Sequence, residues 1–212
     1  MSKKNKKQED LFLSRVPLEL FNMDLSFNAI KLYILIDSFD NNDNPAFFSQ
    51  KYAMEKMGCK NRNLISRAIK ELEEKNLIKV IRKSKHSNQY IRMPNKSFEK
   101  HFGLMDINAI KFLSKTELKV YAYILAFQGV YNITDKQRIA KELQIHISQV
   151  YKALKSLNEK GLLHVVSQVK YVKKVIYRAY NIIPERTRTK INKQVHYVVT
   201  GKRLPEFLLK FA

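Results

Sequence analysis

The sequence predicts a mainly α-helical chain with small β-hairpins, an α+β fold built from two tandem copies of one unit. Residues 25–39 and 113–127 match at several positions when the chain is shifted by 88 residues. Residues 64–78 and 149–163 match in the same way at a shift of 85 residues. Two matched blocks in the same order indicate a duplicated unit of roughly 80 to 90 residues.

The duplication sets the expected domain boundaries. The chain has 212 residues and 45% of them are apolar, so each copy can bury a core of its own. We expect a basic arm over 1–10, a first domain over 11–98, a second over 99–184, and a basic linker with an apolar C-terminal segment over 185–212.

In the first copy, apolar residues at helical spacing predict a helix over 27–39, with Ser26 as its N-cap. Ser49 is placed to cap a second helix over 50–57, which Gly58 ends. Asn61 is placed to cap a third helix that runs to about Asn76.

A hairpin is expected directly after the third helix. Residues 77–83 and 89–93 read as short strands, the polar residues 84–88 form the turn between them, and Pro94 ends the second strand.

The second copy repeats the order. Its expected elements are a helix over 116–127, a helix over 135–143 capped by Thr134, a turn over 144–147, a helix opened by Ser148 and ended by Gly161, a strand over 162–168, a basic turn over 169–173, and a strand over 174–183. A short apolar segment precedes each copy, at 11–21 and at 102–110.

Two helices joined by a short turn, followed by a hairpin, form a winged helix-turn-helix. In each copy the third helix has an apolar stripe, and its opposite face carries short polar and basic side chains of the kind that contact base edges in a major groove. The residues expected to contact bases are Arg62, Asn63, Ser66, Arg67, Lys70, Ser148, Gln149, Tyr151, Lys152 and Lys155.

A second group of basic residues is expected over phosphates, where contacts position the protein without reading sequence. These residues precede the first recognition helix, lie in the wing turns, or follow the second unit: Lys60, Lys83, Lys85, His86, Lys170, Lys173, Lys174, Arg186 and Arg188. His146, just before the second recognition helix, is either a DNA contact or a surface turn residue.

The charge balance points to a polyanion as partner. The chain holds 40 Lys and Arg against 19 Asp and Glu, a formal net charge of +21. A compact protein with this excess repels itself unless a polyanion such as DNA accompanies it. No apolar run approaches the roughly 20 residues of a membrane span, and a single cysteine suits a reducing compartment. We therefore expect a cytoplasmic protein with no membrane partner.

The segments SRAIKELEEKNLIKV (66–80) and KALKSLNEKGLLHV (152–165) resemble the recognition helix and first wing strand of bacterial winged-helix domains. The longer segment RVPLELFNMDLSFNAIKLYILI (15–36) resembles the N-terminal winged helix of phage and plasmid replication initiators, the replisome organisers. Two such domains in tandem is also the plan of Rep-class plasmid initiators. The resemblance covers about residues 14–183 and implies binding to repeated sites at an origin and recruitment of a helicase or its loader.

Other functions stay open at this stage. The same domain serves transcriptional repressors and regulators, and winged helices also act as non-enzymatic adaptors that bind proteins. We expect double-stranded DNA as partner, with replication or transcription proteins and a homodimer as further possibilities. The five histidines, the single cysteine and the five glycines form no metal, nucleotide or catalytic motif. We therefore expect no enzyme activity, no cofactor and no metal.

Overall fold

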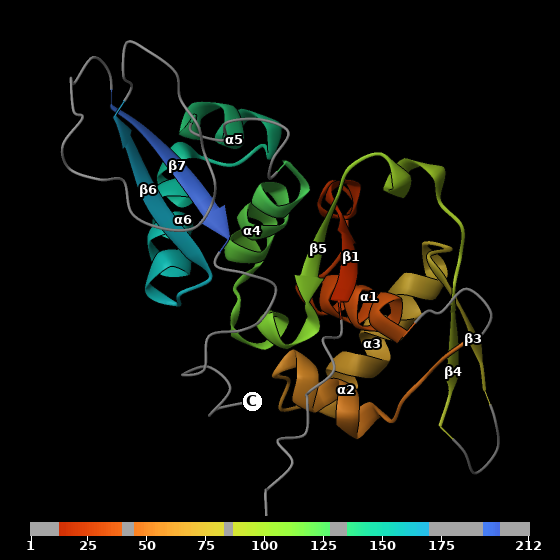
Figure 1. The fold of residues 1–212 in the computed structure, drawn as a ribbon. Helices are drawn as coiled ribbons and strands as arrows, with labels where there is room; N and C mark the ends of the chain where they lie inside the picture. The colour runs from red at the N-terminus through yellow and green to blue at the C-terminus, as the bar shows by residue number, and fades with distance from the viewer. Residues whose placement is uncertain (1–12, 40–44, 83–86, 128–134, 170–192, 200–212) are drawn as a thin grey trace, which may run out of the picture.

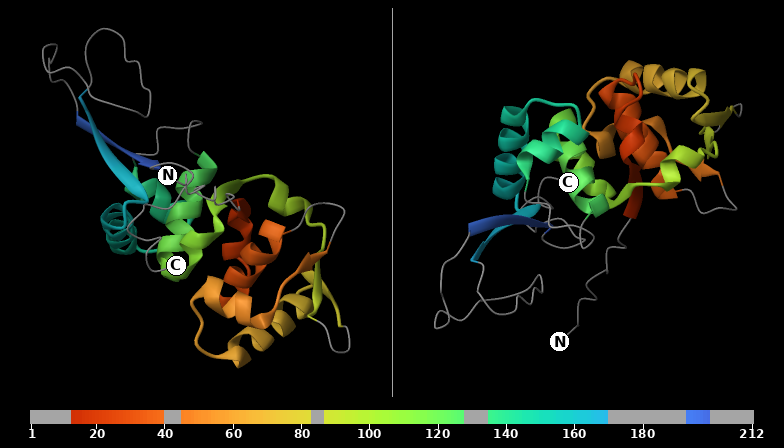
Figure 2. Two further views of the ribbon diagram at one scale, coloured as in Figure 1. Left: turned by 60° about the horizontal axis from the view of Figure 1, so that its bottom comes forward. Right: turned by 90° about the horizontal axis from the view of Figure 1, so that it is seen from above.

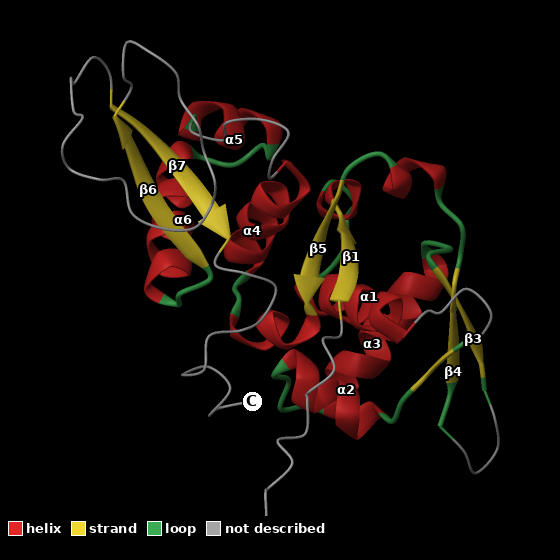
Figure 3. Cartoon of the chain, in the orientation of Figure 1, coloured by secondary structure: helices red, strands yellow, loops and turns green. Residues whose placement is uncertain are grey.

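The structure is a computed structural model that describes residues 13–39, 45–82, 87–127, 135–169 and 193–199, with side chains described up to residue 163. It is mostly helical with small antiparallel sheets, as the sequence predicts (Figures 1 and 3). The expected arm over 1–10, the wing turn 83–86, and the segments 170–192 and 200–212 lie outside these residues.

The first unit begins with strand β1 (Leu13–Pro17) and the 3-10 helix η1 (Leu18–Phe21), followed by α1 (Phe27–Phe39). The expected bounds of α1 are confirmed, and Ser26 Oγ accepts a hydrogen bond from the backbone N–H of Ala29 at 3.2 Å. A carboxylate from the third helix completes this cap, because Glu71 accepts hydrogen bonds from both the backbone N–H and the hydroxyl of Ser26.

The helix-turn-helix of the first unit consists of α2 (Gln50–Met57) and α3 (Arg62–Glu74). The side chains of Ser49 and Asn61 cap the two helices, as expected from the sequence. Gly58 ends α2 at a φ of 69°, a left-handed conformation that glycine adopts without a steric penalty. The spacing of these caps fixes where the turn falls and where α3 begins.

The wing of the first unit has three strands rather than the expected two. β3 (Ile78–Ile81) pairs with β4 (Gln89–Arg92), and β4 also pairs with β2 (Ala46–Phe47), so the order is β2-β4-β3. The sequence did not reveal β2, because a two-residue strand leaves no alternating pattern to read.

The 3-10 helix η2 (Lys96–Glu99) leads to the second unit, which begins with β5 (Phe102–Asp106) and the 3-10 helix η3 (Ile107–Phe112). These are followed by α4 (Lys115–Phe127), α5 (Lys136–Glu142), α6 (Ile147–Glu159), β6 (Leu163–Val169) and β7 (Lys193–Val199).

Two local expectations for the second unit need correction. Helix α5 is capped by Asp135, whose side chain accepts from the backbone N–H of Gln137 at 2.8 Å, rather than by Thr134. Helix α6 begins at Ile147 rather than at Ser148, because the ring of His146 serves as its N-cap. Gly161 follows the end of α6 at a φ of 66°, as expected for a residue that stops a helix.

The second wing also differs from expectation. The strand partner of β6 is β7, in the register Leu163↔Val199 to Val169↔Lys193. The sequence predicts this partner at 174–183, a range that lies outside the described residues. Residues 193–199 are instead expected in the segment after the second domain, because they follow a strongly basic stretch that resembles a linker.

The two units meet through their first strands. β1 and β5 form an antiparallel pair in the register Leu13↔Asp106 to Pro17↔Phe102 (Figure 1). One face of this pair packs on α1 and α4, and the buried apolar residues of both units form one continuous core. The short apolar segments that precede the two copies in the sequence are therefore the elements that join them.

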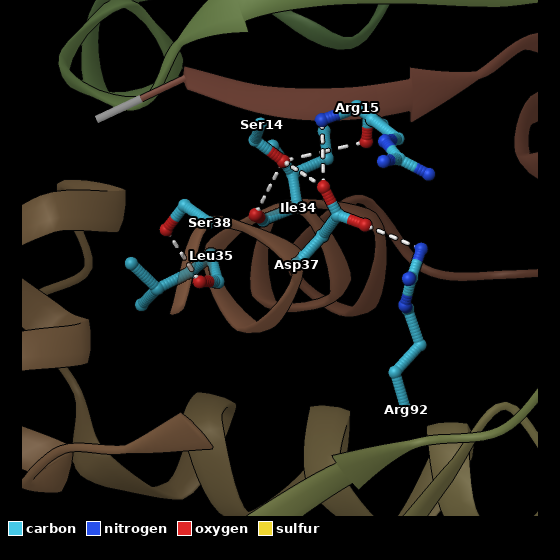
Figure 4. A network of polar contacts seen from close by, with 7 residues as sticks. All are labelled: Ser14, Arg15, Ile34, Leu35, Asp37, Ser38 and Arg92. Atoms are coloured by element: carbon cyan, nitrogen blue, oxygen red, sulfur yellow. Dashed lines mark hydrogen bonds and ion pairs between the residues drawn. The ribbon is translucent and has the colours of Figure 1, made fainter. Parts of the chain in front are cut away.

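A buried polar network fixes the first unit to this joint (Figure 4). The carboxylate of Asp37 on α1 accepts hydrogen bonds from Ser14 Oγ at 3.0 Å and from the backbone N–H of Arg15 at 2.6 Å. Its other oxygen lies 2.6 Å from Arg92 Nη1 on β4. Burial raises the pKa of Asp37, and the positive charge of Arg92 opposes that rise. The network connects β1, α1 and the wing.

Candidate nucleic-acid interface

Helix α3 presents its expected polar face to solvent. Its apolar stripe packs inward through Ile65, Ala68, Ile69 and Leu72. The residues expected to contact DNA on the opposite face are all exposed: Lys60 just before the helix, then Arg62, Asn63, Ser66, Arg67 and Lys70. The structure therefore brings the first set of sequence-predicted residues together on one surface.

Arg62 and Arg67 lie in the N-terminal half of α3, whereas the acidic residues near its C-terminal end each have a basic or polar partner. Glu71 is turned toward the cap of α1, and Glu73 pairs with Arg82 at 2.5 Å at the base of the wing. Lys70 Nζ lies 3.6 Å from the exposed carboxylate of Glu74. The N-terminal half of a recognition helix is the part that contacts base edges in helix-turn-helix complexes, so the cationic half is the one suited to enter a groove.

The second recognition helix, α6, is built in the same way but carries different side chains. Val150, Ala153, Leu154 and Leu157 are buried. The predicted contact residues Ser148, Gln149, Tyr151, Lys152 and Lys155 are all exposed. Lys155 Nζ lies 3.9 Å from Glu159, which repeats the Lys70–Glu74 pair of the first unit at a shift of 85 residues.

The start of α6 has a local structure that the sequence analysis did not anticipate. Gln149 Oε1 accepts a hydrogen bond from the backbone N–H of His146 at 3.2 Å, and Ser148 Oγ lies 2.7 Å from His146 Nδ1. The ring of His146 and the side chain of Gln149 therefore form a capping box, and the hydroxyl of Ser148 contacts the capping ring. His146 is a helix cap, and Tyr151, Lys152 and Lys155 lie further along the exposed face.

Two lysines near the recognition helices, Lys51 and Lys136, are not among the contacts expected from the sequence. They lie in the first turns of α2 and α5. They occupy equivalent positions in the two units, because they are 85 residues apart. Lys51 is exposed and lines an open depression of about 480 Å³ together with Arg62. Lys136 Nζ lies 4.3 Å from the centre of the Tyr151 ring on α6. The sequence carries a signal for these positions, because both units have a lysine there when they are aligned at the shift of 85 residues.

The depression in the first unit adds to the exposed face of α3. It lies between the first turn of α2, the start of α3 and strand β4. Phe48 and Tyr90 also line it, and their rings stack on each other with centres 4.9 Å apart. Arg62 Nε donates to the side-chain oxygen of Gln50 at its edge. This contact holds the Arg62 guanidinium at the junction of the two helices.

Within the described residues, no three His, Cys, Asp or Glu side chains gather as a metal ion would need. Among the helices of the same residues, none is both long and apolar enough to cross a membrane. The predicted wing and tail contacts Lys83, Lys85, His86, Lys170, Lys173, Lys174, Arg186 and Arg188 fall outside the described part of the chain.

Comparison with known proteins assigns both units to the same broad class. Residues 24–78 match a helix-turn-helix domain family, and residues 113–183 match the family of sugar-specific transcriptional regulators TrmB. The chain is also 29% identical over 143 residues to the DNA-directed RNA polymerase III subunit RPC6 of Saccharomyces cerevisiae, a match that covers 66% of this chain and 40% of that subunit. No solved structure gives a significant match. The chain thus contains two helix-turn-helix domains of the DNA-binding winged-helix type.

Proposed function

We propose that the protein binds a specific double-stranded DNA sequence and that both units take part. The observation that carries this proposal is the exposed, cationic N-terminal half of α3, with α6 in the equivalent place of the second unit. Apolar stripes hold both helices against the core and turn their polar faces outward, as entry into a major groove requires.

The mechanism has two parts. Lysine and arginine side chains displace counterions from phosphates and supply affinity that falls with salt concentration, whatever the base sequence. The polar face of each recognition helix then selects bases, and Arg67 is the residue of α3 best suited to a bidentate contact with guanine. The net charge of +21 makes the first part strong.

Two biological roles fit this activity. Regulation of transcription is supported by the TrmB family match over the second unit. Initiation of plasmid or phage replication is supported by the resemblance of residues 15–36 to replication initiators and by the tandem arrangement of the two domains. A non-enzymatic adaptor, in which the same basic faces meet an acidic protein, is the alternative from another class.

One experiment tests the activity and separates the roles. The full chain is incubated with a pool of random duplexes and with sheared DNA from its source, and bound fragments are sequenced and footprinted at about 150 mM salt. Enrichment of one sequence supports the proposal, and its position beside an origin or a promoter assigns the role. Binding that is equal for all sequences, or absent, overturns sequence recognition and leaves the adaptor.

A further inference from the structure

The depression beside the first recognition helix has the size and the lining of a small-molecule site. Its volume of about 480 Å³ falls within the roughly 300–1,000 Å³ that such sites span. Two cations and four neutral hydrogen-bonding residues line it: Lys51, Arg62, Ser49, Gln50, Ser87 and Asn88. None of the described residues that line it is acidic, so the depression favours an anion.

The two cations suit a phosphate monoester. Arg62 Nε donates a hydrogen bond to the side-chain oxygen of Gln50, so its two Nη groups can form the fork that matches a pair of phosphate oxygens. Lys51 adds a second, more compact charge. Within the described residues, neither of these cations forms an ion pair. A monoester carries about 1.5 to 2 negative charges near pH 7, which two cations balance, whereas each phosphate of DNA carries one.

The second unit does not repeat these groups. The two recognition helices begin 85 residues apart, and Ile147 stands where the first unit has Arg62. The N-cap of the preceding helix is Ser49 in the first unit and the acidic Asp135 in the second. A carboxylate at that place repels an anion. Because both units are helix-turn-helix domains, a feature that only one of them has points to a task beyond the fold they share.

The position of the depression links its occupation to DNA binding. Figure 2 shows α2, α3 and the β2-β4-β3 sheet together at one end of the molecule, and α5, α6 and the β6–β7 pair at the other. The depression belongs to the first group, and Arg62 is both part of its lining and the first residue of α3. A phosphorylated ligand bound there would engage Lys51 and Arg62 and would place negative charge beside the face that a duplex has to approach.

We propose that this depression binds a small phosphate monoester with hydroxyl or amide groups on its body, and that the ligand and DNA exclude each other from the first unit. Lys51 and Arg62 hold the phosphate, while Ser49, Ser87 and Asn88 form hydrogen bonds with the body. The binding of the ligand stands on the depression alone, whereas its effect on DNA rests on the proposed function.

Isothermal titration calorimetry of the full chain without DNA tests the binding. The probes are nucleoside 5′-monophosphates and pentose and hexose phosphates, each beside its unphosphorylated counterpart, with inorganic phosphate as the reference. We expect at least one class of monoester to bind at least tenfold more tightly than its unphosphorylated counterpart and than inorganic phosphate, and that class identifies the body of the ligand. If no monoester does so, the proposal is wrong.

Protein variants place the ligand. Lys51→Ala and Arg62→Ala should each weaken binding of the monoester at least tenfold and leave the melting temperature unchanged, because both side chains are exposed. Lys136→Ala is the matched control, since Lys136 lies in the first turn of α5 with its Nζ 4.3 Å from the centre of the Tyr151 ring, and it should leave monoester binding unchanged. Full binding by the first two variants, or equal losses in all three, would show diffuse attraction to a cationic surface and overturn the site.

Competition is measured by fluorescence anisotropy on the duplex that the full chain selects. When two ligands exclude each other, the apparent Kd is multiplied by one plus the ratio of the competitor concentration to its own Kd. The monoester at ten times its Kd should therefore weaken DNA binding about tenfold in the unaltered chain and little in Arg62→Ala. An unchanged DNA affinity would refute the competition. A chain that binds the monoester but enriches no DNA sequence would instead refute the proposed function and leave the ligand site standing.

Discussion

Lys160 Nζ, just after α6, lies 2.7 Å from Glu117 Oε1 in the first turn of α4, so an ion pair joins the end of the second recognition helix to the core of its unit. Glu117 also accepts a hydrogen bond from the backbone N–H of Ser114 at 2.6 Å, and Ser114 Oγ accepts one from the backbone N–H of Glu117. This is a capping box. Burial by itself raises the carboxyl pKa, but the hydrogen bonds from Lys160 and Ser114 outweigh it and lower the pKa of Glu117 to about 2.

The first prediction concerns the pH dependence of stability. A carboxylate with a lowered folded-state pKa contributes stability that is fully present above its unfolded value, here 4.5, and is lost as the pH falls toward about 2. The shift of roughly 2.5 units (4.5 minus 2) corresponds to about 3 kcal/mol. Glu117→Gln should therefore lower the free energy of unfolding by about that amount near neutral pH, and the deficit should shrink between about pH 5 and pH 2.

Urea unfolding followed by circular dichroism across this range measures the deficit. Glu159→Gln is the matched control, because Glu159 is exposed and its 3.9 Å pair with Lys155 contributes little. A deficit for the Glu117 variant that stays constant with pH would contradict the proposed role of the carboxylate.

The caps show what the sequence could and could not predict. Ser26, Ser49 and Asn61 were found from the sequence, because an N-cap acts within three residues of its own position. The carboxylates that complete the caps of α1 and α4 were not found. In the first unit, the carboxylate at the cap of α1 comes from Glu71 on α3. The equivalent position of the second unit is Ser156, which has no carboxylate, and the cap of α4 is completed by Glu117 of α4 itself.

The same limit applies to strand pairing. The recognition helices and the outward direction of Arg67 and Tyr151 followed from helical periodicity, which is a local signal. The pairing of β1 with β5 joins residues about 90 positions apart, and the pairing of β6 with β7 skips a basic segment. No local pattern encodes the register of such pairs, because it is set by which apolar faces the shared core buries.

The second prediction concerns the buried carboxylate of Asp37. Its side chain is 5% exposed and Arg92 lies 2.6 Å away, so removal of the guanidinium leaves a buried charge without its counterion. Arg92→Met should destabilise the fold by about 3 kcal/mol. Adding Asp37→Asn should recover part of the loss, because the amide oxygen still accepts from the backbone N–H of Arg15 and carries no charge. Thermal unfolding of the two variants decides the matter, and a double variant no more stable than Arg92→Met would refute the electrostatic explanation.

The third prediction concerns the joint between the units. A Cβ atom at Gly103 on β5 would lie 2.7 Å from the carbonyl oxygen of Ala122 and 2.7 Å from Leu125 Cβ, both on α4. The helix backbone cannot move away easily, so Gly103→Ala should lower the free energy of unfolding by about 2 kcal/mol. The neighbouring Leu104→Ala is the control, since Leu104 is 45% exposed. Chemical denaturation of both proteins tests this, and equal stability would show that β5 has room to shift.

The fourth prediction concerns Tyr151, whose side chain is 52% exposed on the reading face of α6, with Lys136 Nζ 4.3 Å from its ring centre. An exposed ring on a recognition helix can contact a thymine methyl group. Tyr151→Ala should weaken binding to the selected duplex about fivefold and leave the melting temperature unchanged, while Tyr151→Phe keeps the ring and most of the affinity. Anisotropy titrations compare them, and equal affinity for the alanine variant would remove Tyr151 from the interface.

The last prediction separates base reading from phosphate contact. Arg67 is exposed in the cationic half of α3. Arg67→Ala should therefore weaken the free energy of binding to the selected duplex by about 1–3 kcal/mol, and the free energy of binding to random DNA by much less. Lys51→Ala, at the first turn of α2, removes one charge beside the same helix, and should weaken both duplexes alike and reduce the salt dependence by about one unit of log–log slope. Lys100→Ala removes an exposed charge next to η2 and serves as the control. Titrations of the three variants at several salt concentrations measure the affinity of each for both duplexes and the salt dependence of each. If Arg67→Ala lowers affinity for specific and random DNA by the same factor, then Arg67 contacts phosphate, and base selection by the first unit must come from its neighbours on α3.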